Sequence, residues 1–159
     1  MASGPRKGIQ LEIGHPTPVA TAEQKGELLS AVTRELIRLH KQYYGRGATR
    51  ARALFAHPNL LFVEMEDVFL TVEHTLVEKG QREFVHEARR TFQSAMRDEF
   101  IGAIERLVGR RVEGYESVTF TAPDRVLEIF YLDPGTEEAG PDSPVLYETE
   151  GMAEESEPT

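Results

Sequence analysis

The chain has 159 residues, no cysteine and a formal net charge of −9 at pH 7. A chain of this length can build one domain with a sizeable core, whereas the lack of cysteine excludes a disulfide framework, a thiolate metal site and a cysteine nucleophile. No apolar run reaches the roughly 20 residues that a membrane-spanning helix requires, and the N-terminus has no signal-peptide core, so we expect a soluble, cytoplasmic protein with no membrane insertion.

The negative charge is concentrated at the C-terminal end of the sequence. Residues 133–159 hold nine acidic residues and no lysine or arginine, whereas residues 1–132 hold 18 acidic and 18 basic residues. The main body is therefore neutral, and a local basic surface on it is compatible with the acidic total. Residues 134–159 offer too little apolar surface to offset the entropy of ordering, which predicts a disordered acidic tail.

The first ordered element predicted is a helix that begins at Thr21. Residues 1–20 contain three prolines and several small residues, which indicates a flexible arm. Thr21 and Gln24 then have the spacing of a capping box. Apolar residues recur after them at steps of three and four, at Leu28, Val32, Leu36, Leu39 and Tyr43. Gly45 is expected to end this helix.

Residues 50–66 favour a β-hairpin over a helix. Residues 50–56 suit a short helix by propensity, but His57-Pro58-Asn59 is turn chemistry and an apolar run follows it. A short helix comes next, with Thr71 as its predicted N-cap and Gly80 as its end. From residue 81 to residue 108 the apolar positions keep a helical period, which predicts one long helix that ends at Gly109.

A second hairpin completes the predicted fold. Residues 111–120 and 126–132 are strand-like, and Pro123 lies in the turn between them. The order α-β-β-α-α-β-β over residues 21–133 predicts a single α+β domain in two layers, with an antiparallel sheet of two hairpins and helices packed on one face. Aromatic and branched side chains supply both faces of the second hairpin, so we expect a second copy to cover the open face and form a homodimer.

Four short stretches carry a resemblance to a known family. They are Leu39-His40-Lys41-Gln42-Tyr43-Tyr44-Gly45-Arg46-Gly47, Leu70-Thr71-Val72-Glu73-His74-Thr75-Leu76, Glu87-Ala88-Arg89-Arg90 and Gly109-Arg110-Arg111-Val112. With these stretches in this order, the chain resembles the MpsC-like family of small bacterial proteins over most of the predicted domain. The family's name implies an accessory role in a sodium-translocating, membrane-potential-generating system. The resemblance implies no catalytic mechanism.

The segment after the first helix is the main candidate for ligand binding. Glycine allows close approach of backbone N–H groups and arginine donates in a planar fork, so the two together suit a phosphate or a carboxylate. The candidate anion site consists of Gly45, Arg46, Gly47, Thr49 and Arg50. Against it, the segment follows a helix C-terminus, where the dipole disfavours an anion, and it lacks a known phosphate-loop pattern. A helix stop followed by a tight turn explains the same residues.

Glu73 and His74 place a carboxylate beside an imidazole, as an acid/base pair requires. On a helix, however, adjacent residues point about 100° apart, so the two side chains are poorly placed to act on one proton. We predict instead that Glu73 forms a structural ion pair with Arg89 or Arg90 and thereby fixes two helices together.

Other chemistries have less support in the sequence. Glu83 and His86 have the spacing of a helical metal-ligand pair, but no further ligands complete a motif, so we predict no metal. The neutral body and the acidic tail argue against nucleic acid. We also predict no catalytic residue and no cofactor.

Three functions therefore remain open. The first is an accessory or regulatory protein of a bacterial ion-transport system, which acts by binding proteins such as membrane-transport subunits and reaches the membrane only through them. The second is a sensor that binds a phosphate-bearing or other anionic small molecule at residues 45–52. The third is an enzyme that uses Glu73 together with Arg46.

Overall fold

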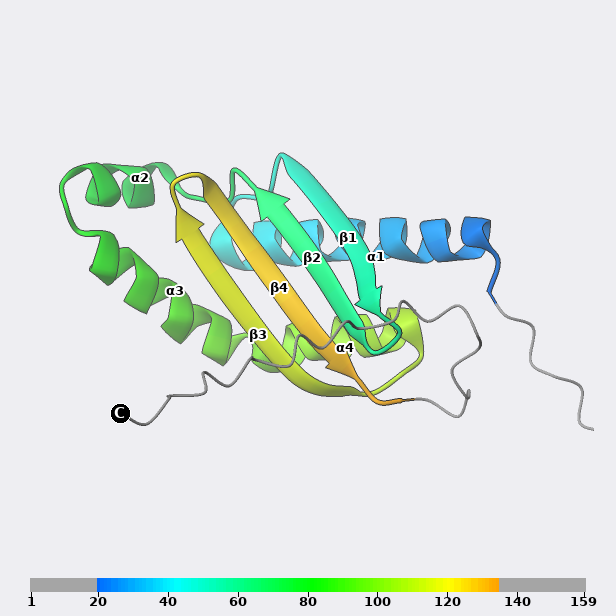
Figure 1. The fold of residues 1–159 in the computed structure, drawn as a ribbon. Helices are drawn as coiled ribbons and strands as arrows, with labels where there is room; N and C mark the ends of the chain where they lie inside the picture. The colour runs from blue at the N-terminus through cyan, green and yellow to red at the C-terminus, as the bar shows by residue number, and fades with distance from the viewer. Residues whose placement is uncertain (1–19, 135–159) are drawn as a thin grey trace, which may run out of the picture.

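The computed structural model describes residues 20–134 of the chain. Within this range a four-stranded antiparallel sheet carries helices on one of its faces (Figure 1). The predicted arm and the predicted acidic tail lie outside the described residues, apart from Ala20 and Pro134.

Helix α1 (Ala22–Tyr44) begins and ends as predicted. The Thr21 hydroxyl accepts a hydrogen bond from the Gln24 N–H, and the Gln24 side chain accepts one from the Thr21 N–H. At the other end Gly45 has a left-handed conformation with φ 81°, and its N–H donates to the Lys41 carbonyl. The predicted capping box and the predicted glycine stop are both confirmed.

Strands β1 (Arg50–His57) and β2 (Leu60–Glu66) form the first hairpin. Residues 50–56 are therefore strand rather than helix. Ala51, Ala53 and Phe55 pack against the core, and the side chains between them are exposed. This period of two outweighs the helical propensity of alanine and arginine, because the strand gains a buried face.

Helix α2 (Thr71–Glu78) has Leu70 as its N-cap, so the prediction of Thr71 as N-cap is wrong. The Glu73 carboxylate accepts the Leu70 N–H at 2.7 Å. The Asp124 carboxylate accepts the N–H groups of the two residues before Leu70, at 3.0 and 2.9 Å. Glu73 thus satisfies the N–H of the N-cap residue itself, and Asp124 holds the chain that leads into the helix.

Residues 81–108 form two helices, α3 (Arg82–Ala95) and α4 (Arg97–Val108), instead of the predicted single helix. Met96 lies between them with φ −96° and ψ 7°, outside the α-helical range. The two helices run in different directions from this point (Figure 1). The Arg97 guanidinium, at the start of α4, donates to the Tyr115 carbonyl at 2.7 Å. The bend keeps both helices in contact with the sheet, whose strands twist.

Strands β3 (Val112–Thr121) and β4 (Asp124–Leu132) form the second hairpin. The sheet order is β1-β2-β4-β3, and every neighbouring pair is antiparallel. The predicted α+β class, with two hairpins and helices on one face, is confirmed.

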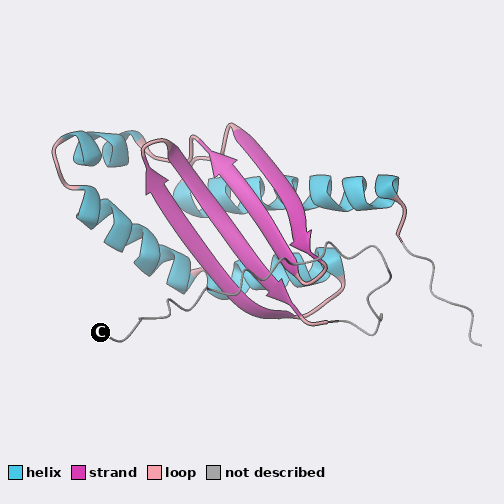
Figure 2. Ribbon diagram, in the orientation of Figure 1, coloured by secondary structure: helices cyan, strands magenta, loops and turns pink. Residues whose placement is uncertain are grey.

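The helices lie against one face of the sheet (Figure 2), and side chains from both layers form the core. Its apolar side chains come chiefly from α1, α4, β2 and β4. Four polar or charged side chains are buried among the described residues: His40, Arg89, Gln93 and Glu128. These polar side chains lead to the candidate site.

Candidate functional site

Arg89 lies on the core face of α3 and is 1% exposed. Its Nε and Nη2 atoms donate to the two carboxylate oxygens of Glu73, both at 2.7 Å, and Nη2 also donates to the Val68 carbonyl at 3.1 Å. The guanidinium carbon lies 5.0 Å from the centre of the Tyr44 ring and 4.3 Å from that of Phe69. This arrangement, here named the Arg89 clamp, joins α3 to α2 and to the end of α1 through a bidentate ion pair and two cation–π contacts.

The clamp occupies the carboxylate that an acid/base mechanism would need. Glu73 accepts from Arg89 with both oxygens and from the Leu70 N–H as well. The neighbouring His74 instead has its Nε2 atom 3.2 Å from the Asp124 carboxylate. Arg90, the other partner that the sequence offered to Glu73, has an exposed side chain. The geometry therefore gives Glu73 a structural contact and keeps it apart from His74.

The glycines of the predicted anion site have clear structural roles. Gly45 supplies the left-handed residue that ends α1. At Gly47 a Cβ atom would lie 3.1 Å from the Ile37 side chain and 3.3 Å from its carbonyl, so a larger residue would force the chain and α1 apart by a few tenths of an ångström. Both positions are explained by a helix stop and a close return of the chain.

The polar side chains of the predicted anion site contact acidic residues. Arg46 donates from Nε to the Asp67 carbonyl at 3.1 Å, and Thr49 donates from its hydroxyl to the Asp67 carboxylate. Arg50 lies 3.2 Å from the Glu66 carboxylate. These contacts bring the predicted residues together beside the β2–α2 link, where two carboxylates already offset much of their positive charge.

A buried polar cluster, which the sequence analysis did not identify, lies between α1 and the sheet. It consists of His40, Tyr115 and Glu128. The Tyr115 hydroxyl donates to one Glu128 oxygen at 2.8 Å, and the His40 Nε2 atom lies 3.3 Å from the other. His40 also stacks on the Tyr44 ring, with centroids 4.9 Å apart. Tyr44 therefore connects this cluster to the Arg89 clamp.

Two tyrosines in this region have shifted acidities. Burial raises the pKa of Tyr115, and the nearby Glu128 carboxylate raises it further. Burial also raises the pKa of Tyr44, although the Arg89 charge acts in the opposite direction. Neither hydroxyl is therefore ionised near neutral pH. The Tyr115 hydroxyl donates a hydrogen bond to Glu128, whereas the Tyr44 ring serves packing.

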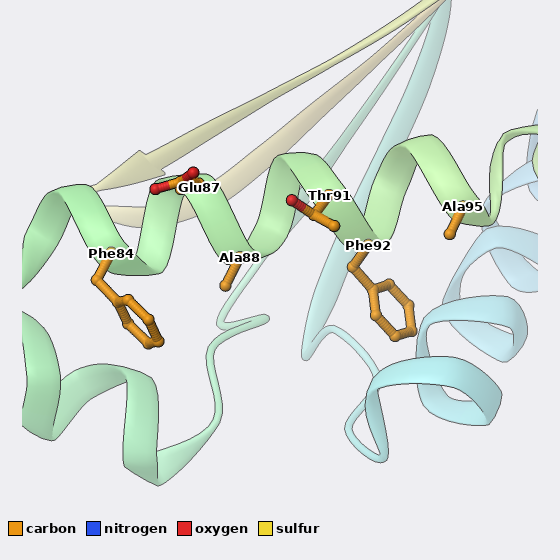
Figure 3. A pocket seen from close by; sticks show the side chains of 6 residues that line it. All are labelled: Phe84, Glu87, Ala88, Thr91, Phe92 and Ala95. Atoms are coloured by element: carbon orange, nitrogen blue, oxygen red, sulfur yellow. The ribbon is translucent and has the colours of Figure 1, made fainter.

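An apolar depression of about 500 Å³ lies on α3, away from the core face. Its lining residues are Phe84, Glu87, Ala88, Thr91, Phe92 and Ala95. Figure 3 shows Phe84 and Phe92 pointing to the same side of α3, with Ala88 between them. Phe84 is 60% exposed, whereas Phe92 packs against the Tyr44 ring with centroids 4.4 Å apart. The floor of the depression is thus continuous with the packed interior, and its rim is open.

The sequence contains signals for the depression and for the buried polar cluster, but they overlap with the pattern of the core residues. On α3 the apolar period combined two stripes, since Val85 packs in the core whereas Ala88 and Phe92 line the depression. In β4 Glu128 stands at an inward position between Val126 and Phe130, where the strand alternation calls for an apolar side chain. A carboxyl group at such a position requires a buried partner, which is the signal that would have predicted the cluster.

The described part of the chain adds two further observations. Among residues 20–134, no group of three or more histidine or acidic side chains is arranged to hold a metal ion. In the same range, the helices are either too short or too polar to cross a membrane.

The fold and the site define an α+β domain whose apolar core encloses a small polar cluster and whose surface has an open apolar depression. Residues 24–134 match the family described as Na+-translocating membrane potential-generating system (MpsC). The chain belongs to this family. No curated protein and no solved structure matches it.

Proposed function

We propose that the chain is an accessory or regulatory component of a bacterial sodium-translocating, membrane-potential-generating system and that it acts by binding another protein of that system. Membership of the MpsC family supports the link to the system. The apolar depression on α3 supports the mode of action, because an open, largely apolar hollow on a helix is a common docking site for a partner segment.

The spacing of the lining residues favours a helical partner. Phe84, Ala88 and Ala95 belong to one stripe of α3, and 11 residues of helix extend over about 16 Å, or three turns. The small alanines leave holes, into which large apolar side chains of a second helix fit. We therefore propose an amphipathic helix of a membrane subunit as the partner, with large apolar residues at steps of three and four. The chain would then be cytoplasmic and held at the membrane only through this partner.

The proposal is tested by copurification of the chain with the membrane subunits of the system in detergent. Phe84→Asp places a charge in the depression and is expected to reduce the recovered complex at least about tenfold. Val72→Asp is the matched control, since Val72 is 59% exposed on the neighbouring helix and does not line the depression. Equal recovery of the wild type and the Phe84→Asp variant would contradict the docking site.

A sensor of anionic ligands is the second candidate. Arg46 is exposed, and within residues 20–134 its side chain makes one hydrogen bond, through Nε, which leaves both terminal amino groups available to a ligand. Under this proposal, inorganic phosphate or a nucleotide raises the melting temperature in a saturable manner, because it binds the folded state alone. Arg46→Ala is then expected to remove the shift. If no ligand in the screen shifts the melting temperature in a saturable manner, the sensor function is excluded and protein binding remains.

A further inference from the structure

The two central strands of the sheet are apolar on both faces. β4 reads Val126-Leu127-Glu128-Ile129-Phe130-Tyr131-Leu132, and β2 begins Leu60-Leu61-Phe62-Val63. An antiparallel sheet with one face in water normally alternates apolar and polar side chains, and a continuous apolar run indicates a strand that is covered on both sides. The helices cover only one face of this sheet (Figure 2).

The open face is a regular grid, because the strand register fixes which outward side chains are neighbours. The first row, across β1, β2, β4 and β3, is Arg50, Glu66, Arg125 and Phe120. The second is Arg52, Glu64, Leu127 and Val118, and the third is Leu54, Phe62, Ile129 and Glu116. The last row holds Leu60, Tyr131 and Gly114.

An apolar band crosses this grid diagonally. It runs from Phe120, at one corner on β3, through Leu127 and Ile129 to Leu54 on β1. Phe120 is 43% exposed and Leu54 is 50% exposed. Large apolar side chains that remain this exposed in a continuous band mark an interaction surface.

The charges on the two sides of the band are complementary. On one side three arginines and two glutamates form a network of ion pairs with distances from 2.8 to 3.6 Å: Arg50, Arg52, Arg125, Glu64 and Glu66. This group carries one excess positive charge. On the other side, Glu116 is exposed and carries one negative charge. The whole face therefore has no net charge.

We propose that this open face binds a second copy of the chain, with a two-fold axis along the apolar band. Rotation about an axis in the plane of the face places the band of one copy on the band of the other. The same rotation carries each side of the band onto the opposite side, so Glu116 of each copy faces the arginine group of the other near Arg50. A face that meets itself must be neutral overall and complementary across the axis, and both conditions hold here.

The size of the face sets the expected strength of the dimer. Four strands spaced about 4.8 Å apart, each about seven residues long, give a flat area of roughly 400–500 Å² per copy. A standard interface buries about 800 Å² of accessible surface per partner. The dimer is therefore a modest one that dissociates on dilution. This pairing uses the sheet and leaves the depression on α3 free, so it is independent of the proposed docking of a membrane subunit.

The test is sedimentation equilibrium of the full chain over a concentration series. The wild type is expected to show a monomer–dimer equilibrium, and Leu54→Asp and Phe120→Asp are each expected to raise the dissociation constant at least about tenfold. Val72→Asp, on α2 and away from the face, is expected to dimerise as the wild type does. Glu116→Arg is expected to weaken the dimer, and the double variant Glu116→Arg with Arg50→Glu is expected to restore part of the loss.

Three results would overturn the proposal. They are a wild-type chain that stays monomeric at every concentration, a dimer that persists in both aspartate variants, and a dimer that is indifferent to Glu116→Arg. Circular dichroism of each variant verifies that it is folded before its association is compared.

Discussion

Arg89 is the residue that joins most parts of the helical layer. Its guanidinium binds Glu73 of α2 and the Val68 carbonyl, and it lies against the Tyr44 ring at the end of α1. A buried ion pair adds little net stability compared with apolar residues of the same volume, but a single broken partner leaves an uncompensated buried charge. The clamp is therefore sensitive to the loss of either side chain.

Arg89→Met is expected to lower the free energy of unfolding by about 3–5 kcal/mol, because the Glu73 carboxylate, 12% exposed, loses its partner. Arg90→Met, at the exposed neighbouring position, is expected to change it by less than about 0.5 kcal/mol. Urea unfolding measures both values. Adding Glu73→Gln to Arg89→Met is expected to recover part of the loss. Similar values for the Arg89 and Arg90 variants would show that the clamp does not stabilise the fold.

Because Tyr44 and Tyr115 are largely buried, the protein is expected to lose stability at alkaline pH. The folded protein holds the protons of Tyr44 and Tyr115 to a higher pH than the unfolded chain, in which tyrosine ionises near pH 10. Their contribution is therefore complete below pH 10 and declines above it, by about 1.4 kcal/mol per pH unit for each tyrosine.

This effect is measured by urea unfolding between about pH 9 and pH 11. In Tyr115→Phe, the free energy of unfolding is expected to decline less steeply with pH, because the contribution of one tyrosine is lost. Tyr131→Phe, at an exposed position on the outer face, is expected to keep the wild-type slope. Parallel slopes for all three proteins would contradict the pKa shift at Tyr115.

At the scale of the elements, two glycines of the α1 region show how backbone conformation affects stability when side-chain packing plays no part. Gly26 lies inside the helix and Gly45 follows it with φ 81°, and in both cases a Cβ atom would meet no other group within 4 Å. Gly26→Ala is therefore expected to stabilise the protein by about 0.5–1 kcal/mol through helix propensity. Gly45→Ala is expected to destabilise it by about 1 kcal/mol through the left-handed conformation. Thermal unfolding compares the two, and changes of the same sign would refute this explanation.

Local patterns predicted most of the elements because each is determined by residues close together in sequence. The capping box at Thr21, the stop at Gly45 and both hairpins follow from such patterns. The link before α2 could not be predicted in this way, because the Phe69 N–H donates to Asp124, 55 residues away in the sequence. The bend at Met96 was missed for the same reason, since the apolar period continues through it and only the sheet determines where each helix packs.

The candidate site was only partly accessible from the sequence. The partner of Glu73 was predicted as Arg89 or Arg90, and only the core face of α3 distinguishes the two. The group of His40 and Glu128 joins residues 88 positions apart, which no local pattern connects. The open depression could not be predicted without knowing how the helices are arranged in space, because its apolar stripe merges in sequence with the core stripe of α3.

At the scale of the whole molecule, two apolar surfaces lie on different layers. The depression belongs to α3 in the helical layer, and the apolar band belongs to the open face of the sheet. If both proposals hold, the chain pairs with itself and binds a partner at the same time. Each can be altered alone, because each has an exposed large apolar side chain, Phe84 in the depression and Leu54 in the band.

The Phe84→Asp variant in the depression is expected to fold as the wild type does. Phe84 is 60% exposed, so Phe84→Asp is expected to change the free energy of unfolding by less than about 0.5 kcal/mol. Urea unfolding measures this value and determines whether a loss of binding reflects the surface or the fold. A loss of several kcal/mol would place Phe84 in the core and remove it from the proposed docking site.

The most direct test of the proposed function is the sodium-dependent membrane potential of cells that carry the transport system. The potential is measured with a voltage-sensitive dye after deletion of the gene for this chain and after its return as wild type, Phe84→Asp or Val72→Asp. We expect that deletion lowers the potential, that the wild type and Val72→Asp restore it, and that Phe84→Asp at equal abundance does not. A potential that is unchanged by deletion, or restored fully by Phe84→Asp, would contradict an accessory role carried out through the depression on α3.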